Sequence, residues 1–290
     1  MPARTGFEIV GHRGARGLFP ENTLEGFEAA LRRGGRRFEI DIAVTADDIP
    51  VLYHDFVLNP DITRGPGGAW LTRPGPPLRA LTLAALSAYD VGRIRPGSAY
   101  AARHPSQKPS DGARVPTLTA ALAAAPEAHF TIELKTDPTQ PGLTIPGPRM
   151  AELVVAVAEA AGALGRIRIE SFDWSGPRHL ARMRPEIARA WLTEPKTEAA
   201  AAVWWGVAPA GHALPRLIAE EGGGAWAPAF ETIGAADVEA ASHLGIDVLP
   251  WTVNEPKAMS RLAGWDVGGL ITDRPDIALA LFAGEAFISH

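Results

Sequence analysis

The sequence predicts an α/β fold, a TIM-like (β/α)8 barrel with a small insertion, or cap, after a hairpin on the second strand. Short β-branched or apolar segments alternate with alanine- and leucine-rich helical segments, which is the pattern of βα repeats around a parallel sheet. The chain has 290 residues, 46% of them hydrophobic, so it can bury one large core or two smaller ones. No linker divides it, which favours a single domain over residues 1–290.

Nine segments have strand character, one more than a closed eightfold barrel needs. They are expected, in chain order, at residues 8–11, 38–44, 51–54, 130–134, 167–171, 188–192, 226–230, 248–253 and 269–272. Helical segments are expected at residues 23–33, 117–125, 147–161, 177–183, 211–220, 235–244 and 256–263. The first of these helices begins with Asn22 and Thr23, which are favourable capping residues.

The third strand is expected to form a hairpin with the second. Only residues 47–50 separate the two, whereas a parallel crossover needs about a dozen residues or more. The turn then sets Val44 opposite Val51. By the same register Asp41 faces His54, although a slip of one residue would turn His54 to the other face. Removing the third strand leaves eight helix-spaced strands for the barrel.

Residues 56–115 are rich in proline, glycine and arginine and lack strong periodicity. A segment of this length without regular structure is unusual inside a compact domain and marks a functional lid or insertion. We expect it to form a small cap over the mouth of the barrel.

The composition excludes several classes of partner and site. A net charge of -5 leaves no basic excess for phosphate backbones, so nucleic acid is not expected as a partner. The chain has no cysteine, so any metal must bind to oxygen or imidazole ligands. No apolar signal segment precedes the first strand, and no segment reaches the roughly 18 uninterrupted apolar residues of a membrane span. We expect a cytoplasmic protein without stable membrane insertion, and the sequence leaves its oligomeric partners unknown.

Two carboxylates, Glu39 and Asp41, point to the same face of the second strand because side chains alternate along a strand. In a barrel interior they would repel each other unless a cation lay between them, which indicates a divalent cation, Mg²⁺ or Ca²⁺. The same spacing also fits an amphipathic strand with a solvated acidic face. Glu133 lies near the C-terminal end of a later strand, where barrel catalysts collect, and is the expected third ligand.

Two histidines are expected at the same mouth, because His12 follows the first strand and His54 ends the hairpin. A histidine pair beside a metal site is suited to general acid–base attack on a phosphoester. Each histidine alone also fits a structural hydrogen bond or a metal ligand, and the carboxylates beside the pair favour catalysis. Arg13 can present a planar fork to a phosphate, or it can be plain surface charge.

Three further residues are candidates for substrate binding. Lys135 is expected on the same face of the strand as Glu133, where it offers a positive charge either to a phosphate or to Glu133 itself. Trp251 and Asn254 end a later strand, where Trp251 would pack a small polyol or the core and Asn254 would hydrogen-bond the polyol. Other residues at strand ends have no assigned role: Ser171, Phe172 and Asp273.

Eight short motifs follow one another along the chain. They are His12-Arg13-Gly14, Pro20-Glu21-Asn22-Thr23, Glu39-x-Asp41, His54-Asp55, Glu133-x-Lys135, Ser171-Phe172, Trp251-Thr-Val-Asn254 and Thr272-Asp273. Their order and spacing resemble the glycerophosphodiester phosphodiesterase family from residue 8 to about residue 276, which is nearly the whole chain. The chain departs from the family pattern at the hairpin turn, where Asp47-Asp48 replaces the usual Asp-Gly, and before Glu39, where Arg36-Arg37-Phe38 replaces small apolar residues.

The resemblance implies a (β/α)8 barrel that hydrolyses a glycerophosphodiester, such as glycerophosphocholine or glycerophosphoethanolamine, to sn-glycerol 3-phosphate and an alcohol. The site residues it implies are Glu39, Asp41 and Glu133 for the divalent cation, His12 and His54 for acid–base catalysis, and Arg13 and Lys135 for the phosphate. Direct attack by water and initial attack by the glycerol 2-hydroxyl both stay open, as does which histidine is the acid.

Two other functions are weighed against this one. A lysophospholipase D, or a phospholipase that cleaves by cyclisation, would need an apolar groove for an acyl chain at the barrel mouth. Residues 56–115 contain Trp70, Tyr89 and Tyr100 among prolines and arginines but no clear apolar run. A non-catalytic barrel that binds a phosphorylated polyol would not require the histidine pair and three carboxylates together.

Overall fold

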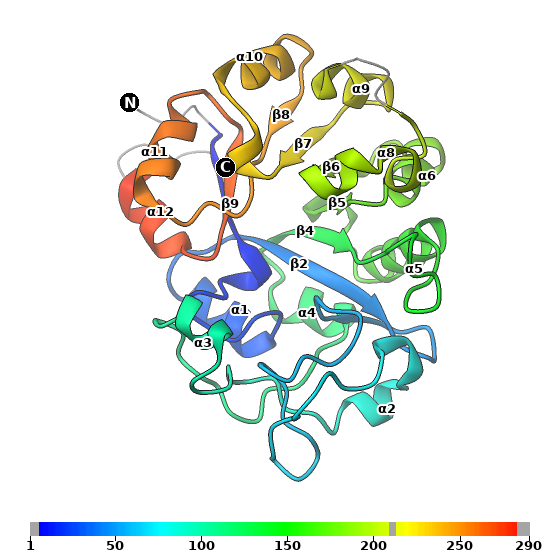
Figure 1. Ribbon diagram of the computed structural model, residues 1–290, viewed down its shortest axis with the longest axis vertical. Coiled ribbons are helices and arrows are strands. Elements are labelled where there is room, and N and C mark those ends of the chain that lie inside the picture. The colour runs from blue at the N-terminus through cyan, green and yellow to red at the C-terminus, as the bar shows by residue number, and fades with distance from the viewer. Residues whose placement is uncertain (1–5, 209–212, 283–290) are drawn as a thin grey trace.

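The computed structural model describes residues 6–208 and 213–282, and it confirms the α/β barrel. Its parallel strands lie side by side in the order β8-β7-β6-β5-β4-β2-β1-β9, with helices around the outside, as Figure 1 shows. Between β8 and β9 the ring is joined by backbone hydrogen bonds. The Gly268 N–H donates to the Val248 carbonyl at 2.9 Å, and the Ile271 N–H donates to the Pro250 carbonyl at 3.0 Å.

The strands lie where the sequence predicts them, and their bounds differ from the expected ones by at most two residues except near one proline. Their bounds are β1 Glu8–Gly11, β2 Arg37–Val44, β3 Pro50–Leu52, β4 His129–Leu134, β5 Ile167–Ser171, β6 Ala188–Thr193, β7 Ala225–Pro228, β8 Asp247–Val248 and β9 Gly269–Thr272. The strand expected at residues 248–253 ends early, because Pro250 has no N–H for the ladder. A single bridge between Ala229 and Trp251 continues the pairing beyond it.

The helices lie between the strands in sequence. The expected ones are α1 Leu24–Leu31, α4 Leu118–Ala124, α5 Gly147–Ala160, α6 Ser175–Met183, α9 Leu214–Glu220, α10 Ala235–His243 and α11 Pro256–Ala263. The helix expected at 211–220 begins on residues outside the described ranges. Further helices are α2 Leu83–Leu86, α3 Ala99–Arg103, α7 Pro195–Ala199, α8 Ala201–Trp204 and α12 Pro275–Phe282. Among all described helices, none has the length and apolar character to cross a membrane.

The outer face of the sheet packs against the helices through aromatic side chains. Phe38 on β2 and Phe130 on β4 both contact Phe27 on α1, with ring centroids 5.4 and 5.8 Å from that of Phe27. Thr23 caps α1 by accepting a hydrogen bond from the Gly26 N–H at 3.1 Å, as its sequence position predicts. This packing fixes the strands that carry the inward-facing polar residues.

The hairpin register is one residue away from the expected one. Ala43, not Val44, pairs with Val51. The Tyr53 N–H donates to the Asp41 carbonyl at 3.0 Å, so Tyr53 takes the position expected for His54. The expected pairing was therefore wrong, because Val44 pairs with Pro50, and the turn is one residue shorter than the one expected between Val44 and Val51. His54 lies beyond the end of β3, where the chain has left the ladder.

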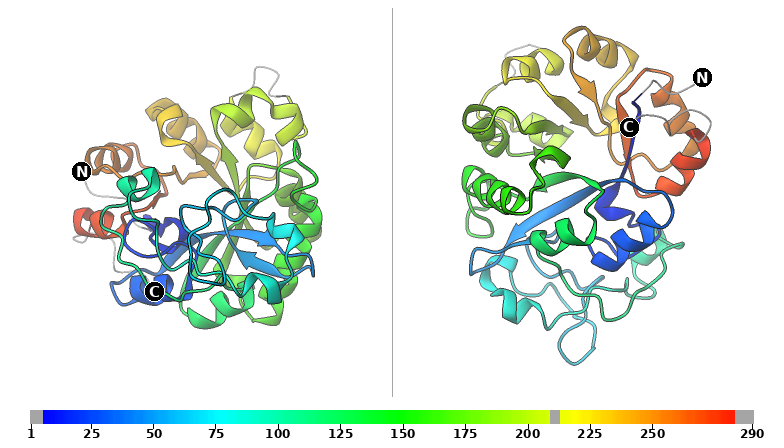
Figure 2. Two further views of the ribbon diagram at one scale, coloured as in Figure 1. Left: turned by 60° about the horizontal axis from the view of Figure 1, so that its bottom comes forward. Right: turned by 180° about the vertical axis from the view of Figure 1, so that it is seen from behind.

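The insertion at 56–115 packs beside the hairpin and has a small core of its own, which includes Leu58, Leu86 and Tyr100 and extends onto Ala43 and Val51 of the hairpin. In Figure 2 it passes across the β2–β3 hairpin at one side of the barrel.

Shortening Ile40 to alanine should weaken the fold. Its side chain is fully buried on β2 at 0% exposure, so Ile40→Ala should lower the free energy of unfolding by about 2–5 kcal/mol in urea titrations. Val203→Ala is the matched control: Val203 is 51% exposed, and its loss should change stability by less than about 0.5 kcal/mol. Equal effects of the two substitutions would contradict the assigned core.

Candidate active site

The C-terminal ends of the strands open on a cavity of about 370 Å³. It collects most of the residues that the sequence singled out: His12, Arg13, Glu39, His54, Glu133, Lys135 and Trp251. Asp41 is fully buried beside them. The insertion contributes Phe56 to the cavity wall, and β5 contributes Glu170 and Phe172. The barrel therefore brings residues from widely separated parts of the chain to one site.

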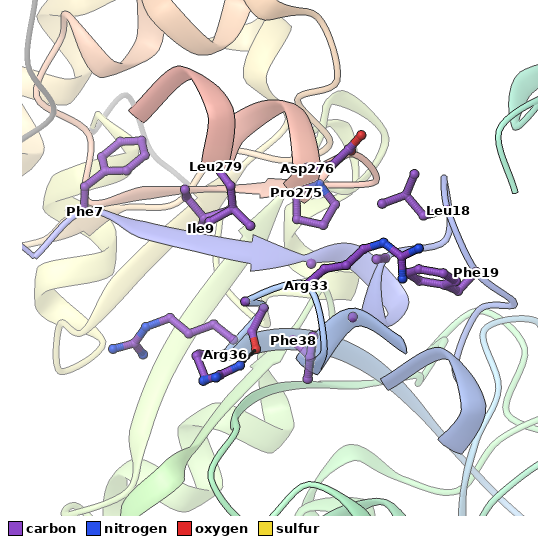
Figure 3. Close-up of a pocket in the computed structure, with 16 residues that line it drawn as sticks. Phe7, Ile9, Leu18, Phe19, Arg33, Arg36, Phe38, Pro275, Asp276 and Leu279 are labelled. Carbon is purple, nitrogen blue, oxygen red and sulfur yellow. Dashed lines mark hydrogen bonds between the residues drawn. The ribbon is translucent and has the colours of Figure 1, made fainter. Parts of the chain in front are cut away.

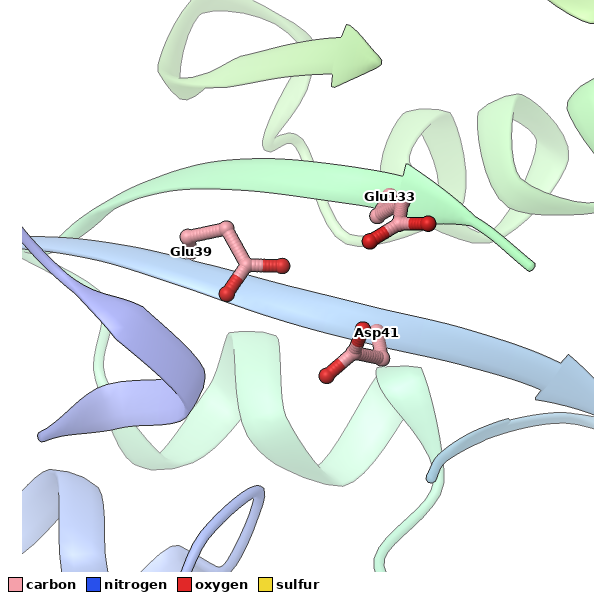
Figure 4. A group of neighbouring side chains, drawn as sticks. All are labelled: Glu39, Asp41 and Glu133. Atoms are coloured by element: carbon pink, nitrogen blue, oxygen red, sulfur yellow. The ribbon is translucent and has the colours of Figure 1, made fainter. Parts of the chain in front are cut away.

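Three carboxylates form a compact cluster inside the barrel, shown in Figure 4. Glu39 and Asp41 project from β2, and Glu133 on β4 is the register partner of Asp41. One oxygen of each lies within 4.8 Å of the others. Glu39 Oε1 and Asp41 Oδ1 are buried and have no hydrogen-bond partner among the described residues. Because unpartnered buried oxygens are costly, and because divalent cations prefer carboxylate ligands, these residues fit a divalent cation.

The cluster is electrostatically strained without a cation. Burial, followed by the charges of Asp41 and Glu170, raises the pKa of Glu39 well above its usual range. Burial also raises the pKa of Glu133 to about 7, against the opposing charge of Lys135. Like charges in a desolvated site oppose each other's ionisation. The cluster therefore retains protons near neutral pH that a bound cation would displace.

Asp41 is the member of the cluster that stays ionised. Burial opposes its ionisation, but the His54 ring, when protonated, and the Arg13 guanidinium outweigh burial and hold the pKa of Asp41 below its usual range. The Asn22 side-chain amide donates to Asp41 Oδ2 at 2.9 Å. Asn22 has a φ of 54°, a left-handed conformation that asparagine tolerates better than most residues. The turn before α1 thus supplies a direct partner to the buried carboxylate.

Each histidine is oriented by an aspartate. His12 Nδ1–H donates to Asp273 Oδ1 at 2.7 Å. His54 Nδ1–H donates to Asp55 Oδ1, also at 2.7 Å. Burial and the charge of Arg16 lower the pKa of His12 to about 4, and burial lowers the pKa of His54 as well. The rings are therefore neutral near pH 7, and Nε2 of each is the nitrogen available for proton transfer.

The two predicted phosphate-binding cations are held by carboxylates. Arg13 Nη1 donates to Glu21 Oε1 at 2.8 Å, and Arg13 Nε lies 3.4 Å from Asp41 Oδ2. Arg13 has a φ of 51°, which is uncommon for a residue with a side chain and is often found at functional sites. Lys135 Nζ donates to Glu133 at 2.7 Å, so Lys135 is a charge partner of Glu133, which was one of its two expected roles. A phosphate contact by either cation stays a prediction.

Trp251 lines the cavity, whereas Asn254 is not among its lining residues. The Trp251 ring packs edge-on against Phe172, with centroids 5.4 Å apart, and both rings line the cavity. The Trp251 indole N–H donates to the Ala227 carbonyl at 2.9 Å, which fixes the ring. The Asn254 amide instead donates to Asp273 Oδ2 at 2.9 Å and accepts from the Asp273 N–H. Asn254 thus positions the aspartate that orients His12.

Glu170 is a site residue that the sequence reasoning missed. It lies on β5 as the register partner of Glu133, is 1% exposed, and lines the cavity. Burial and the charge of Glu133 raise its pKa to about 8. The signal was present in Ile-Arg-Ile-Glu-Ser at residues 167–171, where Arg168 and Glu170 alternate with apolar residues as Glu39 and Asp41 do.

Comparison with protein-family models gives one match, the "Glycerophosphoryl diester phosphodiesterase family", over residues 12–277. A glycerophosphodiester phosphodiesterase of Bacillus subtilis is 27% identical over 277 residues, which cover 92% of this chain and 84% of that protein.

The chain is also similar to solved structures of phosphodiesterases. The crystal structure of a putative glycerophosphoryl diester phosphodiesterase from Silicibacter pomeroyi superposes with a TM-score of 0.89 at 32% identity, covering 99% of this chain and 97% of that one. A phosphodiesterase from Oleispira antarctica, solved with the product sn-glycerol-3-phosphate, shares the fold with a TM-score of 0.73 at 20% identity, and the match covers 97% of each chain.

Removing one ligand should abolish stabilisation by a divalent cation. Saturating Mg²⁺ or Ca²⁺ should raise the melting temperature of the wild-type protein, because a ligand that binds only the native state stabilises it. Glu39→Gln should lose most of this increase, while Glu25→Gln, an exposed carboxylate on α1, should retain it. A full cation-dependent increase in Glu39→Gln, measured by calorimetry, would exclude Glu39 as a ligand.

Cation affinity should rise with pH across neutrality. The pKa of Glu133 is raised to about 7, so lowering the pH from 8 to 6 protonates a ligand and makes the cation compete with a proton. Titration calorimetry should show affinity falling about tenfold over this interval, with proton release detectable as a dependence on buffer ionisation enthalpy. Affinity that does not change between pH 6 and pH 8 would contradict the raised pKa.

Proposed function

This chain belongs to the glycerophosphoryl diester phosphodiesterase family, and we propose that it hydrolyses glycerophosphodiesters such as glycerophosphocholine or glycerophosphoethanolamine to sn-glycerol 3-phosphate and an alcohol. One observation carries the proposal: two aspartate-oriented histidines and three buried carboxylates converge on one cavity. Such a set combines proton transfer with cation binding, and both contribute to cleavage of a phosphodiester.

In this proposal Glu39, Asp41 and Glu133 hold a divalent cation, Mg²⁺ or Ca²⁺. The oxygens of Glu39 and Asp41 that lack a hydrogen-bond partner, and the raised pKa values of the Glu39 and Glu133 carboxyl groups, support this assignment. When bound, the cation would offset negative charge on the phosphate and favour ionisation of the nucleophile. Glu39 and Glu133 would lose their protons on cation binding, and the three carboxylates would take up a fixed arrangement.

The histidines divide the proton transfers of the proposed reaction. A hydroxyl oxygen, from water or from the glycerol 2-hydroxyl, forms a bond to phosphorus while the bond from phosphorus to the leaving alcohol oxygen breaks. One histidine, neutral at Nε2, takes the proton of the attacking hydroxyl. The other enters the reaction as an imidazolium, which the anionic phosphate beside it favours, and delivers its Nε2 proton to the leaving oxygen. Asp273 and Asp55 support this role, because each accepts Nδ1–H and stabilises the imidazolium that forms.

The remaining residues would bind the substrate. Arg13 and Lys135 line the cavity next to the carboxylates and would contact the phosphate oxygens. Both are already ion-paired, so the phosphate would join an existing charge network. Phe172 and Trp251 form an apolar wall at the other side, which suits the carbon skeleton of glycerol.

Removal of either histidine should reduce turnover strongly. With glycerophosphocholine as substrate and released glycerol 3-phosphate coupled to its dehydrogenase, His12→Ala and His54→Ala should each lower kcat by about 10²–10⁴-fold. His129→Ala is the matched control, because His129 begins β4 on the exposed opposite end of the barrel. EDTA should abolish wild-type turnover.

Two outcomes would overturn this assignment. Unchanged turnover in both histidine variants would exclude the acid–base mechanism. Hydrolysis of lysophosphatidylcholine without hydrolysis of any glycerophosphodiester would instead identify a lysophospholipase D on the same barrel.

A further inference from the structure

A second cavity, of about 380 Å³, lies on the outside of the barrel between α1 and α12, as Figure 3 shows. Its walls are Ile9 on the outer face of β1, Phe38 at the start of β2, and Pro275 and Leu279 on α12. The volume is within the range of small-ligand sites. Folded proteins keep few voids larger than a water molecule, so an apolar cavity of this size is suited to a ligand.

The cavity exists because the residues that face it on one side are small. Gly11, Ala15, Ala30, Gly34 and Gly35 line it and supply little side-chain volume between β1, the end of α1 and the connection to β2. The Gly11 backbone approaches Gly14 so closely that a Cβ at Gly11 would lie 2.5 Å from the Gly14 carbonyl oxygen. A larger residue cannot fill the space from that position.

The rim of the cavity is basic. Arg33, Arg36 and Arg37 all lie on it, at the connection from α1 to β2. Arg37 is 3.3 Å from Glu8, and Asp276, the acidic residue of the lining, is paired with Arg274.

Arg33 is the unpaired cation of this rim. Its guanidinium lies over the Phe19 ring at 4.7 Å and donates to the Ala29 carbonyl at 3.2 Å. Within residues 6–208 and 213–282 no carboxylate forms an ion pair with it. An arginine over an apolar cavity provides a charged anchor for an anion whose body is buried below it.

We propose that this cavity binds a fatty acid, with its single acyl chain between α1 and α12 and its carboxylate on Arg33. The apolar walls match the chain, and the Arg33 guanidinium, which has no carboxylate partner among the described residues, matches a monoanionic head group. Two helices and a strand form the walls of the cavity, so it has the shape of a groove for one chain and not of a flat surface for a bilayer. The site is separate from the active site, whose cavity lies on the other side of the His12–Gly14 segment.

Titration calorimetry with monomeric dodecanoate tests the proposal on the intact protein. Saturable binding at one site is expected, and sn-glycerol 3-phosphate should not displace the ligand. Leu279→Trp and Ile9→Phe, which fill the cavity, should each abolish binding while thermal unfolding stays cooperative. Arg33→Ala should weaken binding about tenfold. Arg32→Ala is the control, because Arg32 is paired with Glu28 and lies outside the lining.

Three outcomes would overturn the proposal. The first is the absence of saturable binding. The second is unchanged affinity in both folded cavity-filling variants, which would place the ligand elsewhere. The third is equal affinity of Arg33→Ala and Arg32→Ala, or of dodecanoate and 1-dodecanol, which would exclude a carboxylate contact. Because the readout is binding and not turnover, its failure is distinguishable from a failure of the proposed hydrolysis.

Discussion

Like-charge repulsion inside the barrel is the constraint on which the site depends. Glu39, Asp41, Glu133 and Glu170 project inward from neighbouring strands where little water can screen them. Such a group is stable only if protons, basic side chains or a cation compensate its charge. The structure provides the first two, through raised carboxyl pKa values and through Arg13 and Lys135. The unpartnered oxygens of Glu39 and Asp41 indicate where the third would act.

The turn between β1 and α1 supplies several of the residues that offset the negative charge of the carboxylates or hold the groups that do so. Arg13 approaches Asp41 in a left-handed backbone conformation, and its own N–H donates to Glu39 at 2.9 Å. Glu21 and Asn22 then hold the arginine and the aspartate. Tyr100 from the insertion hydrogen-bonds Glu21, so the insertion contributes to the placement of Arg13 from outside the barrel. Residues that never touch a substrate therefore support the geometry of the site.

Aspartates fix the direction of proton transfer in the proposed reaction. Asp273 lies between His12 and Asn254, and its position depends on β9, which lies beside β1 in the ring. The first and last strands of the barrel thus meet at the His12–Asp273 pair. Closure of the ring therefore places this pair as well as completing the sheet, because it brings together residues that are 261 positions apart.

The sequence by itself determined the barrel, the hairpin and most of the site, because alternation along a strand and the length of a connection are local properties. It predicted the bounds of β1, β5, β9 and α11 as observed, and it brought Glu39, Asp41 and Glu133 to one cluster. It did not determine the hairpin register, since residues 42–44 and 50–52 are all apolar, and a slip of one residue still pairs apolar side chains. The place of Glu170 in the site and the contact of Asn254 with Asp273 depend on which strands become neighbours. The cavity between α1 and α12 likewise depends on packing between helices at opposite ends of the chain, and only the tertiary structure decides that.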